Sequence, residues 1–420
     1  MMVLLFYIVL FVLAFVVVHF TRRHRSRHDF TSLKTVTFGD ESAVTPDRAA
    51  SVISILAIFL IWGAFTGSRL VPFHVPGPFV GDTSFTYTAT NAQGATADAV
   101  VKINVQNSDG GGDAPTADGG AGFAQGDSAV VRAWRSVLLR VRDNDVGGDA
   151  DGYRITAVDG KPIAVDQTVK LAHGTVTLTS KGSLNFEPDK GYQMEPIWLP
   201  SPEAVGKRFV EIASTGYQNT SLAGHLGASL MRVLAGFALG SIAGIPLGYA
   251  MGLSGWFRGW FDPIVEFMRP VPPLALIPLI IIWFGIWESG KIVLLFLAAL
   301  WIMTIAARSG VSGVKISKIH AAYSLGASKW QIMRHVIIPN SLPDIFTGAR
   351  VAMGVCWGTV VAAELVAAEK GAGMMIIAAS KFQLTDIVVM GIILIGIIGY
   401  GIDILMRIAE KRLVPWKGRG

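Results

Sequence analysis

The sequence predicts a mostly α-helical, polytopic membrane protein that carries an inserted all-β domain outside the membrane. Of its 420 residues, 51% are hydrophobic and 16% are charged, and the mean hydropathy is +0.49. This is too apolar for an ordinary soluble protein. The apolar residues form long runs, as spans of ~30 Å of hydrocarbon require. A polar stretch of different composition, residues 79–192, separates two groups of these runs.

Charge and cysteine content exclude several classes of protein. The net charge is +6, but the basic residues flank apolar runs and do not gather with aromatic residues on a polar domain. They therefore indicate membrane orientation, and no nucleic-acid partner is expected. Cys356 is the only cysteine, so an intramolecular disulfide, a Cys-rich metal site and a redox pair are excluded.

Seven segments are long and apolar enough to be predicted as membrane spans: 2–20, 49–66, 227–252, 262–286, 291–308, 344–367 and 385–407. The first has no basic residue before it and no small-residue cleavage site after it, so we expect a retained helix and not a signal peptide. Four arginines follow it, at 22, 23, 25 and 27. The positive-inside rule then places the N-terminus outside the cell and the first loop in the cytoplasm. The remaining crossings place 79–192 outside and the C-terminus inside, where basic residues also gather.

The polar insert reads as short strands joined by turns. Residues 84–105 alternate apolar and polar side chains around an Asn-Ala-Gln-Gly turn, and 175–188 form a second predicted hairpin that turns at Ser180-Lys181-Gly182. Such strands predict a β-sandwich. The glycine-rich stretch 107–127 is predicted to be a flexible linker within it.

One loop of the insert concentrates carboxylates, at Asp143, Asp145, Asp149 and Asp151. Oxygen ligands of this kind surround Ca²⁺, so the loop is a candidate calcium site. The alternative is that these residues form turns by bonding to their own backbone.

The insert resembles the cadherin-like, immunoglobulin-type repeats of bacterial surface proteins, in the strings GDTSFTYTATNAQG, VDG and GSLNFEPDKGY. In those repeats the first of these strings comes last, whereas here it comes first. The resemblance implies a circularly permuted repeat, with the glycine-rich linker joining the old ends. The new ends, near 79–82 and 189–192, are then expected to lie close together, as insertion into a loop requires.

A stretch from His320 to Pro339 has the layout of the EAA loop of binding-protein-dependent permeases: His320-Ala321-Ala322, Gly326, then Val-Ile-Ile-Pro339. Small residues let a short helix lie in a groove of a partner, Gly permits a tight turn, and Pro is expected to stop the second helix. The resemblance implies that Ala321, Ala322 and Gly326 lie on the helix that couples the permease to its ATPase. His320 departs from the family's Glu, which removes one carboxylate from the ATPase contact.

Further strings outside the insert and first span, such as RPVPPLALIPL and VAAELVAA, resemble the nitrate, taurine and alkanesulfonate branch, and most of all the taurine group. This implies a type I ABC importer permease with six core helices and one extra N-terminal helix. The implied partners are a cytoplasmic ATPase dimer that holds ATP and Mg, a periplasmic solute-binding protein, a second permease copy and membrane lipid. The chain itself is expected to be no enzyme and to bind no cofactor, apart from the candidate Ca²⁺.

The predicted domains follow from these assignments. Residues 1–48 form the extra helix and its basic loop, 49–78 the first core helix, 79–192 the periplasmic insert, and 193–420 the core permease with a coupling loop at 316–343. The protein is expected in a bacterial inner membrane, with the coupling loop and C-terminus in the cytoplasm.

Charged residues within spans are costly and therefore mark pathways or partners. The candidates are Arg232, Glu266, Arg269, Arg350 and Glu364. Arg269 opens a proline-rich segment and Glu364 lies late in its span, so these two are the candidate residues of the substrate pathway. The alternative is that such residues reach the interface or pair with each other, as Glu266 and Arg269 can at i, i+3.

Two other functions remain open from the sequence. One alternative is a permease of the same class that imports nitrate or a thiamine precursor, as other members of the family that the chain resembles do. A membrane-anchored adhesion or scaffold protein, acting through the insert, is a different class, but it would not need the coupling loop. No HExxH motif and no nucleophile motif supports an intramembrane enzyme.

Overall fold

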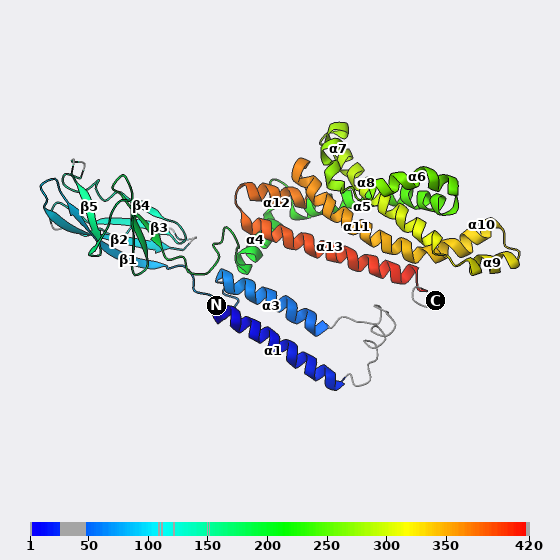
Figure 1. The fold of residues 1–420 in the computed structure, drawn as a ribbon, viewed down its shortest axis with the longest axis horizontal. Coiled ribbons are helices and arrows are strands. Elements are labelled where there is room, and N and C mark those ends of the chain that lie inside the picture. The colour runs from blue at the N-terminus through cyan, green and yellow to red at the C-terminus, as the bar shows by residue number, and fades with distance from the viewer. Residues whose placement is uncertain are drawn as a thin grey trace. The chain divides into compact units, whose positions relative to one another are not determined.

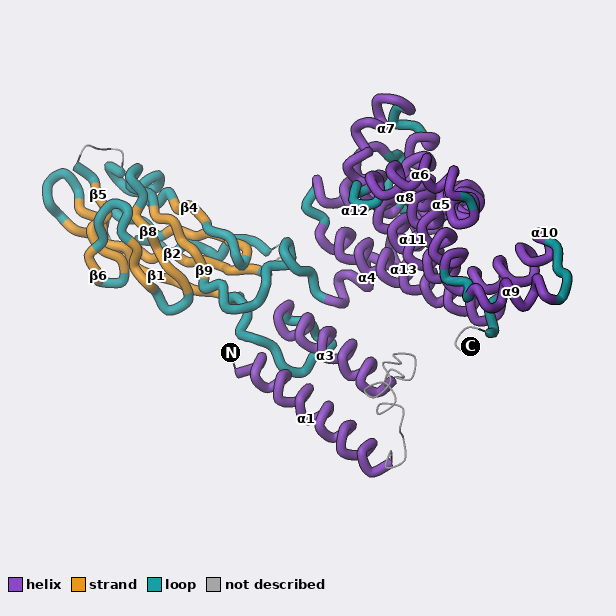
Figure 2. The backbone as a smooth tube through the Cα atoms, turned by 45° about the vertical axis from the view of Figure 1, so that its right-hand side comes forward, coloured by secondary structure: helices purple, strands orange, loops and turns teal. Residues whose placement is uncertain are grey.

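The computed structural model describes residues 2–25, 48–107, 110, 112–120, 122–148, 150 and 152–416 (Figure 1). The chain divides into two compact units, Met1–Glu203 and Ala204–Gly420. Within the described residues the first unit combines helices with two β-sheets, and the second is helical (Figure 2).

Two apolar helices of the first unit pack side by side. They are α1 (Met2–Arg25) and α3 (Arg48–Thr66) (Figure 1). The phenolic hydroxyl of Tyr7 donates a hydrogen bond to the carbonyl of Phe73, at 2.9 Å, and thereby ties α1 to the segment after α3. The outward faces of both helices expose large aliphatic side chains, as expected of helices in contact with lipid.

The insert forms two sheets. The five-stranded sheet has the order β3-β2-β1-β5-β6, and the four-stranded sheet has the order β4-β9-β8-β7. The strands are β1 (Gly81–Thr90), β2 (Thr96–Gln106), β3 (Asp127–Arg132), β4 (Val137–Leu139), β5 (Arg154–Val158), β6 (Lys161–Pro162), β7 (Thr168–Lys170), β8 (Gly174–Leu178) and β9 (Leu184–Pro188). Both predicted hairpins are confirmed, as β1–β2 and β8–β9 are antiparallel neighbours.

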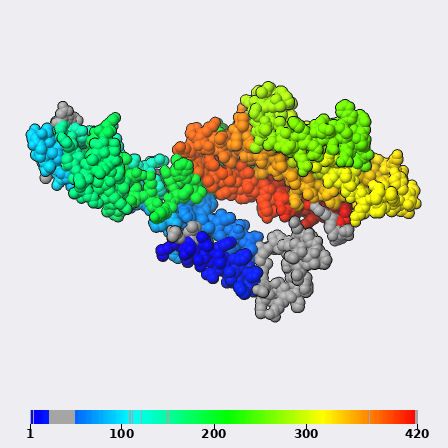
Figure 3. Space-filling view, in the orientation of Figure 1, coloured from blue at the N-terminus to red at the C-terminus, as the bar shows by residue number. Residues whose placement is uncertain are grey.

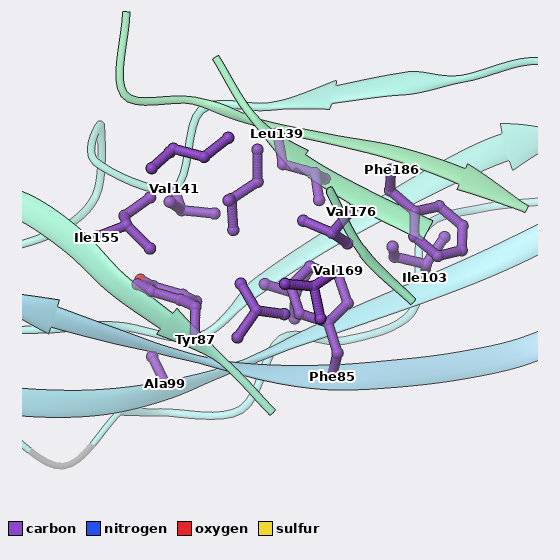
Figure 4. Packing of buried hydrophobic residues seen from close by; sticks show 14 of the residues in the cluster. Phe85, Tyr87, Ala99, Ile103, Leu139, Val141, Ile155, Val169, Val176 and Phe186 are labelled. Carbon is purple, nitrogen blue, oxygen red and sulfur yellow. The ribbon is translucent and has the colours of Figure 1, made fainter. Parts of the chain in front are cut away.

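The two sheets share one hydrophobic core (Figure 4). Inward-facing residues alternate along each strand, as in β1, where Phe85, Tyr87 and Ala89 are buried. The rings of Phe85 and Phe186, from opposite sheets, stack with centroids 6.3 Å apart. The expected face-to-face packing of two sheets is therefore present.

The two ends of the insert meet, as the sequence predicts. The amide of Phe79 donates to the carbonyl of Asp189 at 2.9 Å, and the amide of Tyr192 donates to the carbonyl of Pro76 at 2.7 Å. The chain therefore leaves α3 and returns to the helical part through two adjacent segments.

The candidate calcium loop is only partly described, because Asp149 and Asp151 lie outside the described residues. Asp145 is buried, and its carboxylate accepts hydrogen bonds from the hydroxyls of Tyr87 and Tyr153 and from the amide of Gln125. In the part of the chain that the structure describes, no group of three or more His, Cys, Asp or Glu residues is placed to hold a metal. Asp145 thus acts as a hydrogen-bond acceptor in the core, and the calcium hypothesis gains no support.

Asp127, at the start of β3, makes the stability of the insert sensitive to pH. Burial, together with the nearby Asp145 carboxylate, raises its pKa from 3.8 to about 6. The folded state therefore holds a proton between pH 4 and 6 that the unfolded state has lost, so stability falls as pH rises through this window. One of its carboxylate oxygens, Oδ2, is buried without a hydrogen-bond partner.

We expect Asp127→Asn to stabilise the insert at pH 7.5 by about 1–2 kcal/mol, since the amide is neutral and removes both the cost of burying a charge and the repulsion from Asp145. Hydrogen exchange of the β1 and β2 amides measures this, with the exposed Asp166→Asn as the control. The gain should vanish at pH 4, where Asp127 is protonated in the wild type. An equal gain at both pH values would contradict the assignment.

The helical unit begins with α4 (Pro202–Thr215) and contains α5 (Leu222–Leu253), α6 (Gly255–Met268), α7 (Ile277–Phe284), α8 (Glu288–Ser312), α9 (Ile316–Ser324), α10 (Lys329–Ile332), α11 (Ile338–Ala367), α12 (Ala372–Lys381) and α13 (Thr385–Leu413). The long helices α5, α8 and α11 form its centre, and their buried side chains make up one continuous core.

Glycines bring α5 and α8 into close contact. Gly236, Gly240, Gly244 and Gly248 recur at every fourth position of α5 and are buried. A Cβ atom at Gly236 would lie 2.3 Å from the Cβ of Leu295, and one at Gly248 would lie 2.4 Å from the carbonyl oxygen of Thr304. Only glycine permits this approach, which is the usual way in which helices pack in membranes.

All seven predicted spans are helical, but two differ from the prediction. Among the described residues, five helices are long and apolar enough to cross a membrane, or six if one bent pair counts as a single span. The predicted span 262–286 is that pair: its two parts, Gly255–Met268 and Pro273–Phe284, meet at 92°. The prolines that follow Arg269 remove backbone donors and break the helix there. In α1, the apolar stretch Leu5–Phe20 is shorter than the other candidates.

Candidate functional site

The segment 316–343 forms a helical hairpin at one end of the helical unit (Figures 1 and 3). The helix α9 ends at Ser324, and Gly326 then adopts a left-handed conformation with φ +78°. Ser328 caps α10 in a reciprocal arrangement with Gln331. The glycine turn that the sequence predicts is therefore confirmed.

The hairpin has an anchored face and an exposed face. Ile332 and Ile337 are buried against Val311, and Ala322 and Ala327 pack onto this cluster. Large apolar side chains point the other way: the exposed fractions of Leu325, Trp330, Ile316 and Tyr323 are 88%, 68%, 63% and 51%. An exposed apolar surface of this kind, on a rigid support, is typical of a protein–protein contact.

The residues of the predicted coupling motif take distinct positions on this hairpin. His320, Ala321 and Gly326 are exposed, whereas Ala322 is half-buried against the supporting cluster. The predicted role of Pro339 in stopping the second helix is wrong. A π-helical turn over Met333–Ile337 joins α10 to α11, and Pro339 lies in the first turn of α11. Pro is tolerated there because the wider turn absorbs the missing backbone donor.

A group of charged side chains lies between α5, α8 and α11, with Arg232, Lys291 and Glu364 buried and Glu288 at the exposed edge. The Arg232 guanidinium, 4% exposed, donates two hydrogen bonds to Glu288, at 2.5 and 2.6 Å, and one to Glu364, at 2.5 Å. Lys291 donates to Glu288 at 3.1 Å. A bidentate Arg–carboxylate pair of this kind fixes both partners in orientation. We call these four residues, together with Ser229, the Arg232 cluster.

Ser229 and the first turn of α12 complete the hydrogen bonding of Glu364. Ser229 donates to the Glu364 carboxylate at 2.7 Å, and the amide of Gly373 donates to it at 2.9 Å. A Cβ atom at Gly371, where φ is +144°, would lie 2.4 Å from that carboxylate. Glycine at this position lets the chain close over Glu364, whose side chain is 0% exposed.

The structure separates the two candidate pathway residues. Glu364 is enclosed in the Arg232 cluster and does not face open space. Arg269 is exposed, and its nearest carboxylate is Glu266, at 3.7 Å. This is the i, i+3 pairing that the sequence offers as an alternative. The side chain of Arg350 forms ion pairs with Asp403 and Glu410, each at 3.4 Å.

Sequence reasoning missed Glu288, Lys291 and Ser229. Glu288 and Lys291 lie at the beginning of α8, where charged residues read as ordinary helix-end residues, and Ser229 carries no charge. The Gly-Ala-Gly string at 371–373 is a signal only for the enclosure of Glu364, because glycines allow the chain to fold back on that carboxylate.

Comparison with known proteins identifies the family. Residues 228–415 match the sequence model of a protein family, described as the binding-protein-dependent transport system inner membrane component. This range contains the hairpin 316–343 and the whole Arg232 cluster.

Individual relatives agree with this match. The chain is 45% identical over 226 residues to the taurine transport system permease protein TauC of Escherichia coli (strain K12), which is 54% of this chain and 82% of that protein. It is 38% identical to the aliphatic sulfonates permease SsuC of the same organism, over 52% of this chain and 81% of that protein. It is 33% identical to the nitrate import permease protein NrtB of Leptolyngbya laminosa, over 45% and 68%. Among solved structures, the MetNI methionine ABC transporter is similar at a TM-score of 0.39 and 20% identity, over 45% of this chain and 92% of that one.

The sequence alone leaves a transport protein and an adhesion or scaffold protein as alternatives, and these matches favour the transport protein. The matched proteins are permeases of the taurine, sulfonate and nitrate branch of ABC importers. The chain therefore belongs to the family of inner membrane components of binding-protein-dependent transport systems: it is a multi-pass membrane permease, not itself an enzyme, that works with an ATPase and a solute-binding protein.

Proposed function

We propose that this permease imports taurine or a related alkanesulfonate. The single observation that carries the proposal is the 45% identity to a taurine permease across 82% of that protein. Identity to the sulfonate and nitrate permeases is lower. Taurine carries a sulfonate and an ammonium group, so its pathway needs both cationic and anionic partners.

Coupling to ATP hydrolysis is assigned to the hairpin 316–343. Its exposed apolar side chains offer a docking surface for the ATPase, and its anchored face passes movement on to α11 through a continuous helical connection. His320 stands at the position of the family's Glu, so the ATPase contact there is made without a carboxylate. Ala321, Ala322 and Gly326 keep the small profile that a close contact requires.

The proposed topology follows the positive-inside rule, with the hairpin and the C-terminus in the cytoplasm and the insert in the periplasm. Two copies of the permease form the pathway between them. ATP binding on the cytoplasmic side shifts the equilibrium between inward and outward access.

We further propose that the insert is a permuted immunoglobulin-type domain. The parallel pairing of β2 with β3 supports this, since parallel neighbours need a long connection and 107–126 supply one. If the chain is read as starting at β3, then β3, β4, β5 and β6 take the places of immunoglobulin strands A′, B, C and C′, while β8, β9, β1 and β2 take those of D, E, F and G. The five-stranded sheet then has the order A′-G-F-C-C′ and the four-stranded sheet the order B-E-D followed by β7, which is close to the immunoglobulin arrangement.

Reconstitution tests the proposed function. Proteoliposomes that contain this permease, its ATPase and its binding protein should accumulate radiolabelled taurine only with ATP on the ATPase side. Nitrate should not compete. Accumulation of nitrate and not of taurine would overturn the substrate assignment, and the absence of ATP-dependent accumulation of any tested solute would overturn the import function.

A further inference from the structure

An open groove of about 600 Å³ lies beside the Arg232 cluster, within the helical unit. Small residues of α5, among them Gly227 and Ala228, form its floor, and Arg232, Glu288 and Lys370 contribute its charged groups. A Cβ atom built at Gly227 meets no atom of the described residues within 4 Å, so a side chain at this position would extend into the groove. The groove is therefore large enough for a small solute and is not filled by neighbouring helices.

The groove presents one carboxylate that is only partly engaged. The Glu288 side chain is 55% exposed, although Arg232 and Lys291 hold it in place. A carboxylate accepts about four hydrogen bonds. Arg232 supplies two and Lys291 one, and Oε2 receives only one of these three. Glu288 thus retains room for one further donor on its exposed side.

The groove also presents a cation. The carbonyl of Lys370 accepts a hydrogen bond from Arg232 at 2.9 Å, which fixes the backbone of this residue at the rim. Within the described part of the chain, no ion pair engages its ammonium group. Arg232, Lys291 and Lys370 provide three positive charges against the two carboxylates of Glu288 and Glu364, which leaves one net positive charge.

We propose that this groove binds the zwitterionic aminosulfonate during its passage, an inference that rests on the proposed function. The Glu288 carboxylate accepts hydrogen bonds from the substrate ammonium, and the Lys370 ammonium pairs with the sulfonate. Arg232 does not touch the substrate but positions Glu288. The substrate class is a short chain with an amine at one end and a strong acid at the other.

Glu288 then determines selectivity. A sulfonate without the amine cannot make the charge-assisted hydrogen bond to this carboxylate, and a hydroxyl in its place donates only a weaker, neutral one, which costs affinity. The comparison of taurine with isethionate isolates this contribution, since isethionate replaces the ammonium by a hydroxyl at the same chain length.

The test uses proteoliposomes with the complete complex and compares uptake of taurine and of isethionate. The binding protein is the same in every sample, so a change in the ratio between the two solutes arises in the permease. We expect Glu288→Gln to lower the taurine-to-isethionate ratio at least about tenfold, the size of one lost charged hydrogen bond. An equal fall of both rates would assign Glu288 a structural role only and would overturn the inference.

A second variant tests the groove without altering a charge. Gly227→Leu should reduce uptake of both solutes about tenfold or more by filling the space. The matched control is Gly396→Leu in α13, where a Cβ also meets no atom within 4 Å but which lies outside the groove. If Gly227→Leu transports both solutes at the wild-type rate, the inference about the groove is overturned, whereas taurine import by the wild-type protein still supports the proposed function. If the wild-type protein imports no sulfonate, the proposed function itself fails.

Discussion

Replacing Gly326 with tryptophan should reduce ATP-driven uptake by about 5- to 150-fold while the protein still inserts and folds. The expected cost is about 1–3 kcal/mol, because a large side chain at a closely packed contact displaces the partner. Among the described residues, no atom lies within 4 Å of a Cβ at Gly326, so the tryptophan meets no steric obstacle within the permease, and the strain of its positive φ is measured by the controls below. Its effect would come from the ATPase that docks on the hairpin.

Two controls separate docking from backbone strain. Gly326 has φ +78°, which asparagine adopts more readily than other residues, so Gly326→Asn should keep most of the activity. Gly94, in the turn between β1 and β2, matches Gly326 closely, with φ +79° and no atom within 4 Å of a Cβ. Gly94→Trp should therefore transport normally. Normal uptake in Gly326→Trp would remove the hairpin from the coupling path.

Arg232→Ala should destabilise the helical unit by about 3–5 kcal/mol, since it leaves Glu364 buried with its charge uncompensated. For a unit of this size, the loss corresponds to a fall of roughly 6–20 °C in the unfolding midpoint. Cys356 offers a direct probe: it is the only cysteine, it is fully buried, and a thiol-reactive dye reaches it only after unfolding.

The double variant Arg232→Met with Glu364→Gln provides the comparison. It removes the charge from both sides of this pair, so it should recover part of the loss. Arg232→Lys should be intermediate, because lysine cannot make the bidentate contact with Glu288. An unchanged midpoint in Arg232→Ala would show that the cluster does not hold α5, α8 and α11 together.

The two hairpins β1–β2 and β8–β9 of the insert and most of the helices could be predicted because their signals are local. Alternation along 84–105 fixes which side chains face the core, and Gly326 and Gly182 mark turns that need positive φ. The break at Arg269-Pro-Val-Pro-Pro was harder to place, because hydropathy alone reads 262–286 as one apolar run. Its 92° bend follows from backbone donors lost at the prolines and not from side-chain polarity.

The Arg232 cluster could not be assembled from the sequence, because its members lie far apart in the chain. Arg232 and Glu364 are each recognisable as charges within spans, but their pairing depends on the glycines of α5 that bring the helices together. Glu364 was expected to face the pathway, whereas the structure encloses it, and Glu288 takes the exposed position. Pairing across 132 residues is decided by packing, which hydropathy and charge do not encode.

Cross-linking tests the central claim, that the hairpin 316–343 is the contact through which the ATPase drives this permease. Because Cys356 is buried, a cysteine introduced at Leu325, which is 88% exposed, would be the accessible one. In the assembled complex, Leu325→Cys should cross-link to the ATPase, with a yield that changes between ATP-bound and nucleotide-free states. Val165→Cys in the insert, at a position that is 56% exposed, should not cross-link. A complex that transports solute but gives no cross-link at Leu325 would contradict the account.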